Sequence, residues 1–138
     1  MAKVKEAVQF KESKKNTVAD AKNKLEWIQD HCAVKGFDKE LNDVETAAAI
    51  AELNRIKYAG HADWREPSRP ELITIVDLTR NNPAINPIFK NTKSSWYRTS
   101  TPVAGLSSFV WCVDFHYGYV GSSYKGYRYY VRAVRSSQ

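Results

Sequence analysis

The spacing of apolar residues in this 138-residue chain changes once, near Pro87, and that change limits the folds it can adopt. Before Pro87, two segments carry apolar residues at helical spacing, and each begins with a capping-box pattern. After Pro87, apolar and polar residues alternate with a period of two, which is typical of strands that bury one face. Helices in one half and consecutive strands in the other predict an α+β domain.

The first helix is predicted over residues 42–58. Asn42 and Glu45 provide its capping box, and Gly60 follows its end. Apolar residues recur within it at the i, i+3, i+4, i+7 spacing of a helix face. The stripe expected to be buried consists of Val44, Ala47, Ala48 and Ala51.

The second helix is predicted to begin at Ser68, where Glu71 completes another capping box, and to end near Arg80. Strands are predicted on both sides of the helices. Those before them cover residues 4–10, 17–20 and 25–29. Those after Pro87 cover residues 94–101, 109–116, 119–124 and 129–135, with a tight turn at Tyr117-Gly118.

The composition indicates a folded protein with one core. An apolar fraction of 43%, with four Trp, eight Tyr and five Phe, argues against disorder. We expect a single domain over 1–138, in which 1–96 is a scaffold half and 97–138 a β-rich half. No apolar run reaches the roughly 20 residues of a membrane span, and no secretory signal is visible. Two locations stay open: display on a virion, or the cytoplasm.

Little in the sequence points to chemistry. The three histidines lie on separate predicted elements, so no metal site is expected, and no phosphate-binding or nucleophile motif occurs. We therefore expect no cofactor and no enzymatic activity. A net charge of +6 is moderate and forms no basic stripe, so nucleic-acid binding is not expected either. Cys32 and Cys112 are either a disulfide, a thiol pair or unrelated.

Tyrosine and basic residues are concentrated at the C-terminal end. Residues 97–138 contain seven of the eight tyrosines, and five basic side chains against Asp114 alone. One interpretation is a β-rich segment, because tyrosine favours strands. The other is a contact surface, because tyrosine and arginine are enriched at recognition sites.

Three groups of motifs resemble the Lcl C-terminal-domain family. The first is Gly60-His-Ala-Asp-Trp-Arg-Glu-Pro-Ser-Arg-Pro-Glu-Leu72. The second is Asn82-Pro-Ala-Ile-Asn86 with Ser94-Ser-Trp-Tyr-Arg-Thr-Ser-Thr101. The third is Trp111-x-Val-x-Phe115, Gly118-x-Val120, Lys125 and Tyr130-Val-Arg-Ala-Val-Arg135. The chain departs from the family pattern at Glu66 (usually Leu), Arg98 (usually Trp or Ser) and Ala133 (often Cys).

The resemblance implies a C-type-lectin-like fold and a binding role. Some members of the family are bacterial surface adhesins for sulfated polysaccharides. Others are variable proteins of diversity-generating retroelements, in which adenine-directed mutagenesis changes codons near the C-terminus. A short chain without a signal that ends at this motif looks more like the second kind, and its expected partner is a protein or cell-surface ligand.

The expected binding residues lie between the family-pattern positions of the C-terminal segment. Each residue type in residues 116–128 outside that pattern can arise from an Asn codon by changes at its adenines. The set is rich in Tyr, Ser and Gly, which antibody binding sites also favour. With Arg98 added, the predicted ligand-binding residues are Arg98, His116, Tyr117, Tyr119, Gly121, Ser122, Ser123, Tyr124, Gly126, Tyr127 and Arg128.

Two alternatives stay open. An adhesin-like module would bind sulfated polysaccharide through basic side chains, namely Arg98, Lys125, Arg128, Arg132 and Arg135. An oxidase related to formylglycine generation, which uses a similar fold, would need reactive cysteines, and only Cys32 and Cys112 are present. We also expect all four tryptophans to fill the core with their indole N–H groups bonded internally, and Asp63 to pair with Arg65.

Overall fold

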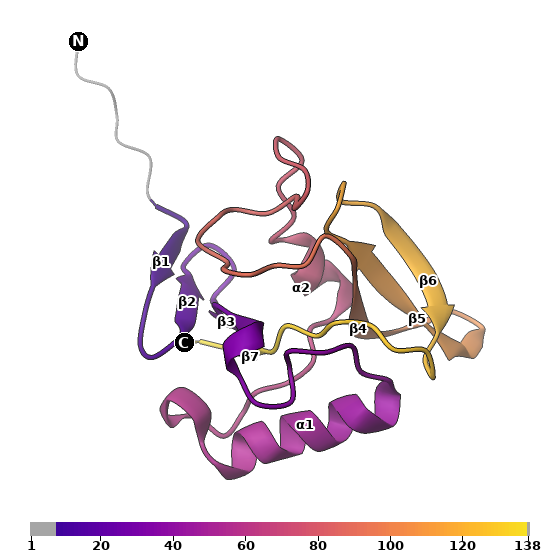
Figure 1. Ribbon diagram of the computed structural model, residues 1–138, viewed down its shortest axis with the longest axis horizontal. Helices are drawn as coiled ribbons and strands as arrows, with labels where there is room; N and C mark the ends of the chain where they lie inside the picture. Colours follow the sequence, from indigo (N-terminus) through magenta and orange to yellow (C-terminus); the bar gives the residue numbers. More distant parts are fainter. Residues whose placement is uncertain (1–7, 138) are drawn as a thin grey trace.

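The computed structural model describes residues 8–137, which form two antiparallel sheets and two helices (Figure 1). The first sheet has the order β1-β2-β3-β7, with the bounds β1 (Phe10–Glu12), β2 (Thr17–Asp20), β3 (Leu25–Ile28) and β7 (Val134–Ser136). The second has the order β4-β5-β6, with the bounds β4 (Trp96–Val103), β5 (Leu106–Asp114) and β6 (Val120–Tyr124). The predicted α+β class is confirmed.

The helices are α1 (Asp43–Arg55) and α2 (Arg69–Ile73), and short 3-10 turns cover His31–Ala33 and Tyr58–Gly60. Both predicted capping boxes are present: Asn42 pairs with Glu45, and Ser68 with Glu71. Within residues 8–137, no helix is long and apolar enough to cross a membrane.

The buried face of α1 differs from the predicted one. Val44 is 72% exposed, and Ala47, Ala48 and Ala51 also face solvent. The residues that face the domain are Thr46, Ala49, Ile50 and Leu53. They have the same spacing in another register, because Leu53 buries more apolar area than an alanine can. The buried Thr46 hydroxyl donates to the Asn42 carbonyl at 2.7 Å, so its burial leaves no unpaired polar group.

Two strand predictions and one helix prediction had the wrong length. The first predicted strand falls partly on residues 4–7, outside the described residues, and β1 begins only at Phe10. The second helix ends at Ile73, because the main chain of Asp77 bonds to Ala84 and Val76 pairs with Ile85 instead of continuing the helix. Residues 129–135 form a regular strand only from Val134, because the chain there crosses between the sheets.

The crossing segment pairs briefly with several elements on its way. Tyr129 bridges to Leu41, Tyr130 to Tyr97, and Val134 to Arg65. Figure 1 shows this segment in yellow, running from β6 back to β7. The C-terminal segment therefore contacts both sheets and the chain just before α1.

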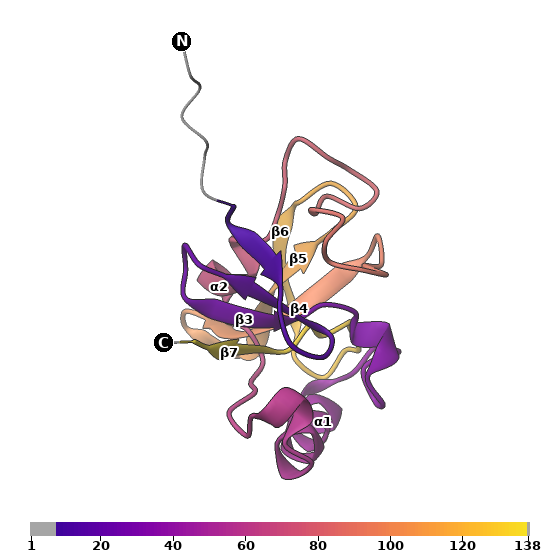
Figure 2. The same cartoon turned by 90° about the vertical axis from the view of Figure 1, so that its left-hand side faces the viewer.

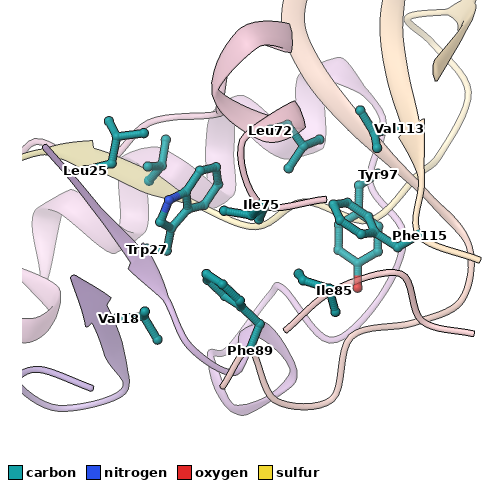
Figure 3. Packing of buried hydrophobic residues seen from close by; sticks show 11 residues of the cluster. Val18, Leu25, Trp27, Leu72, Ile75, Ile85, Phe89, Tyr97, Val113 and Phe115 are labelled. Atoms are coloured by element: carbon teal, nitrogen blue, oxygen red, sulfur yellow. The ribbon is translucent and has the colours of Figure 1, made fainter. Parts of the chain in front are cut away.

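Two apolar clusters hold these elements together. The larger lies between the two sheets and under α2, and includes Trp27, Leu72, Tyr97 and Phe115 (Figure 3). The smaller lies under α1, which Figure 2 shows below the sheets, and includes Phe37, Leu41, Leu53 and Trp64.

Only two of the four tryptophans fill the core as expected. Trp27 and Trp64 are buried, whereas Trp96 and Trp111 are partly exposed. The indole nitrogen of Trp64 donates to the Tyr58 carbonyl at 2.9 Å, but that of Trp27 has no partner among the described residues. The predicted pair of Asp63 with Arg65 is also wrong. Arg65 binds Glu71 and Asp63 binds Arg135, each with a nitrogen–oxygen distance of 2.6 Å.

His31 is buried beside the larger cluster in its neutral form. Its Nδ1 lies 2.7 Å from the Phe37 carbonyl, which can only accept, so Nδ1 carries the proton. Its Nε2 lies 2.6 Å from the Tyr97 hydroxyl and accepts from it. Burial, followed by the positive charge of Arg132, lowers the pKa of His31 from 6.5 to about 4.

This lowered pKa predicts that acid destabilises the fold. The unfolded chain binds a proton at His31 below pH 6.5, whereas the folded chain does not until pH 4. The stability contributed by neutral His31 is therefore complete above pH 6.5 and is lost as the pH falls towards 4. We expect urea unfolding to show a loss of about 2 kcal/mol in the free energy of unfolding between pH 7.5 and pH 5. A His31→Gln variant should lack this loss, and an equal slope in both proteins would contradict the assignment.

The surroundings of Gly118, just before β6, lead to a second prediction about stability. Its φ is +93°, and a Cβ there would lie 2.8 Å from Leu78 Cδ2 and 2.9 Å from Val76 Cγ1. Gly105 also has a positive φ, +77°, but faces open space. Thermal or urea unfolding should therefore show that Gly118→Ala costs about 1 kcal/mol or more beyond the loss caused by Gly105→Ala. Equal losses would mean that the contacts around Gly118 adjust without cost.

Candidate functional site

The strand β6 lies at the free edge of the second sheet, on the side of the molecule away from β1 (Figure 1). It pairs with β5 from Val113↔Val120 to Phe109↔Tyr124. Asp114 donates its main-chain N–H to the Tyr119 carbonyl, and Lys125 donates its own to the Ser108 carbonyl. These two bonds fix which residues of β6 bond to β5 and which, alternating with them, do not. It follows that the main-chain groups of Val120 and Ser122 point away from β5, towards the open edge. These groups have no main-chain partner among residues 8–137.

An aromatic cluster lies at the start of β6. The rings of His116 and Tyr117 are stacked with centroids 4.1 Å apart, and the Tyr119 ring lies 5.8 Å from that of Tyr117. The turn that presents them is held by Asp114, whose carboxylate accepts from the main-chain N–H of His116 at 2.9 Å. A turn is present here, but it is longer than the predicted two-residue turn: residues 115–118 connect Asp114 to Tyr119. Gly118 in this turn has the positive φ given above.

A second aromatic cluster lies after the other end of β6. The Tyr124 ring contacts Tyr127 edge-on at 5.6 Å between centroids, and Phe109 at 6.3 Å. Tyr124 also covers Gly126, where an added Cβ would lie 2.5 Å from the ring. Glycine at 126 is therefore what permits this position of the ring. The four tyrosines of the two clusters are between 45% and 64% exposed.

A small hollow of about 100 Å³ lies on the sheet between the clusters. Its walls are Trp96, Cys112, Gly121, Ser122, Ser123 and Tyr129. Gly121 is set against the Trp96 ring, since a Cβ there would lie 3.1 Å from it. The hydroxyls of Ser123 and Tyr129 are hydrogen-bonded at 2.6 Å. The hollow is too small for a drug-sized molecule but exposes serine hydroxyls beside an aromatic ring.

Arg98 lies beneath this surface and not on it. Its side chain is 2% exposed, its Nε donates to a Glu66 carboxylate oxygen at 2.9 Å, and its Nη1 bonds to main-chain carbonyls. Arg98 was expected at the surface because it departs from the family pattern, but it points to the side of β4 that the crossing segment covers. Its predicted role as a direct ligand contact is therefore wrong for this structure.

The other basic residues of the segment are mostly engaged internally. Arg132 is buried and donates to the carbonyls of Ile28 and Gln29 at 2.7 and 2.6 Å. Arg135 pairs with Asp63 and Glu26. Arg128 is exposed but pairs with Glu45 at 2.8 Å, and Lys125, like Arg132, carries no ion pair among the described residues.

The surroundings of both cysteines disfavour the reactive thiolate form. Both are free thiols, so they do not form a disulfide. Burial raises the pKa of Cys112 to about 11 and also raises the pKa of Cys32. Among residues 8–137, no group of three His, Cys, Asp or Glu side chains is arranged to hold a metal ion.

Nine of the predicted binding residues lie along β6 and its flanking turns, whereas Arg98 is buried and Arg128 pairs with Glu45 of α1. His116, Tyr117 and Tyr119 form one cluster, and Tyr124, Gly126 and Tyr127 belong to the other. Gly121, Ser122 and Ser123 lie between them. Sequence reasoning did not identify three residues that lie beside this surface, namely Phe109, Trp96 and Tyr129. The alternation of the strand gave a usable signal for Phe109, because it places Phe109 opposite Tyr124 once the hairpin register is known.

Comparison with known proteins places this arrangement in a family. Residues 16–135 match the family described as the Lcl C-terminal domain. No curated protein and no solved structure matches the chain. The matched range runs from just before β2 into β7 and so includes both helices, the second sheet with its β6 edge, and the first sheet apart from β1 and the last residue of β7. The chain belongs to the Lcl C-terminal domain family.

Proposed function

We propose that this domain is a non-catalytic binding protein that recognises a protein or cell-surface ligand through residues 116–128. The observation that carries the proposal is the pair of exposed aromatic clusters at the two ends of an open edge strand. Tyrosine rings give large contact area at a low cost in side-chain entropy, and the Gly and Ser residues between them adapt to the partner. Together they span about 17 Å along β6.

The free edge of β6 favours a protein ligand. The main-chain groups of Val120 and Ser122 face outward, and β6 contains no proline and no charged residue that would block an added strand. An extended segment of a partner protein can therefore bond to this edge, while the aromatic clusters contact its side chains.

The finer assignment in this proposal is a C-type-lectin-like variable protein of a diversity-generating retroelement. The burial pattern supports it. Family-pattern residues such as Val113, Phe115, Val131 and Val134 are in the core, whereas the residues between them in 116–128 are mostly at the surface. Changes at most of these surface positions would cost little stability, and the exceptions are Gly121 and Gly126, where a side chain would meet an aromatic ring.

Sulfated polysaccharide is the weaker candidate ligand. Of the five basic residues considered for it, Arg98 and Arg132 are buried and Arg135 and Arg128 are already paired with carboxylates. A polyanion would have to compete with those carboxylates. We therefore expect weak binding to heparin that disappears at moderate salt.

The tyrosines provide the direct test. We expect a variant with Tyr117, Tyr119, Tyr124 and Tyr127 all changed to Ala to lose about 100-fold or more in affinity for a ligand, because buried tyrosines carry much of the energy at interfaces. The ligand would be found by affinity capture with the wild-type domain from host-surface protein, identified, purified and titrated by calorimetry.

A control variant changes Val44 and Ile56 to Ala, since these are exposed apolar residues outside the segment. It should bind like the wild type. Unfolding curves of both variants must show an intact fold. Undiminished binding by the folded tyrosine variant would place the binding surface elsewhere. Strong heparin binding that is lost with salt and is unaffected by the tyrosine changes would instead support the polysaccharide alternative.

The retroelement assignment has its own test. DNA around the gene should contain a near-copy of the coding region for residues 116–128 that differs only at adenines, next to a reverse-transcriptase gene. Sequencing this region decides the matter, and the absence of such a copy would reduce the proposal to a binding domain with a constant surface.

A further inference from the structure

A buried guanidinium bonds to three main-chain carbonyls from two separate segments of the chain. Nη1 of Arg98 lies 3.2 Å from the Leu41 carbonyl oxygen, 3.1 Å from that of Lys125 and 3.3 Å from that of Tyr127. Leu41 immediately precedes α1, and the other two carbonyls belong to the loop after β6. Three carbonyl dipoles that converge on one point repel one another unless a positive charge lies between them.

Glu66 supplies the negative charge that makes this arrangement possible. Its carboxylate accepts from Nε of Arg98 at 2.9 Å, and the two side chains are 18% and 2% exposed. A buried guanidinium without a carboxylate would carry an uncompensated charge, at a cost of several kcal/mol. The carbonyls and the carboxylate together replace the water that Arg98 loses on burial.

The loop held by Arg98 is the one that presents Tyr124 and Tyr127. The N–H of Tyr127 donates to the Tyr124 carbonyl at 3.0 Å, which closes the loop into a turn around Gly126. The Lys125 carbonyl also accepts from the main-chain N–H of Asp43 at 3.1 Å, and this bond ties the turn to the start of α1. The two tyrosine rings then contact each other across the turn.

We propose that Glu66 and Arg98 are positioning residues for the binding surface: their buried ion pair holds the carbonyls of Lys125 and Tyr127 and so fixes the directions of the Tyr124 and Tyr127 rings. The effect on ligand affinity rests on the proposed function, whereas the effect on the loop does not. Arg98 thus acts on the ligand through the loop and not by contact.

Titration of the pair does not by itself release the loop. Burial raises the pKa of Glu66, an effect that the nearby Asp43 carboxylate reinforces and that Arg98 opposes. A carboxyl whose pKa is higher in the folded chain than in the unfolded chain binds its proton more tightly when folded, so acid does not destabilise the fold through this group. The hold on the loop is therefore tested by replacing the side chains and not by lowering the pH.

Amide hydrogen exchange in the free protein tests the positioning role without any ligand. The reporters are the amides of Asp43 and Tyr127, and the reference is the amide of Ile28, which bonds to Ala133 far from the loop. In Glu66→Gln and in Arg98→Met, we expect protection of the two reporters to fall about tenfold or more, because each change removes a charged hydrogen-bond partner. Protection at Ile28 should fall by no more than the loss of global stability that urea unfolding of the same variant gives, and protection of the two reporters should fall further.

Two further variants separate positioning from general stability. Glu52→Gln removes an exposed ion pair with Arg55 and should change neither reporter. The double variant Glu66→Leu with Arg98→Met replaces the buried charges by apolar groups, so its urea midpoint should return close to that of the wild type. Its loop reporters should stay unprotected, because no donor reaches the carbonyls. Recovery of the reporters along with the midpoint would overturn the proposal.

A uniform loss of protection over the whole chain would mean that the pair is only structural. If the loop loosens as expected but an identified ligand binds the double variant as tightly as the wild type, the loop is held as proposed and the binding surface does not include Tyr124 and Tyr127.

Discussion

Two buried guanidinium groups hold the C-terminal segment in place, and the rest of the structure depends on them. Arg132 bonds to the carbonyls of Ile28 and Gln29 at the end of β3, and Arg98 bonds to the carbonyls of Leu41, Lys125 and Tyr127. Between these anchors the chain pairs only through single bridges, so few ladder hydrogen bonds keep it in position. The charged hydrogen bonds of Arg98 and Arg132 hold the segment in position, as the ladder hydrogen bonds of a continuous strand would otherwise do.

Because the buried arginines and apolar clusters hold the fold together, the β6 edge can be polar and open to solvent. The apolar clusters and the buried arginines lie below the sheet, and the tyrosines, serines and glycines lie on its free edge. The proposed binding surface therefore has little part in stability. The glycines at 118 and 126 are exceptions, because a side chain at either position would collide with a neighbour.

Sequence reasoning succeeded where local patterns determine structure. The two capping boxes and the strand pairs β2–β3 and β5–β6 follow from side-chain chemistry within a few residues. Sequence reasoning failed where two helix faces have the same apolar spacing and contacts with residues distant in the sequence decide which face is buried. The alanine run of α1 allows more than one buried face, and contacts with Phe37, Leu41 and Trp64 select the one that contains Leu53.

The sequence by itself determined the fold class, the family motifs and the stretch of tyrosines that forms the exposed edge, because periodicity and turn chemistry are local properties. Only the tertiary structure decided which charged side chains are exposed to solvent and which are buried. Arg98 and Arg128 look alike in the sequence, yet one is buried against Glu66 and three carbonyls and the other is exposed beside Glu45. Burial depends on which segments cross a strand, and the crossing of residues 125–130 over β4 brings together groups that are 27 to 57 positions apart.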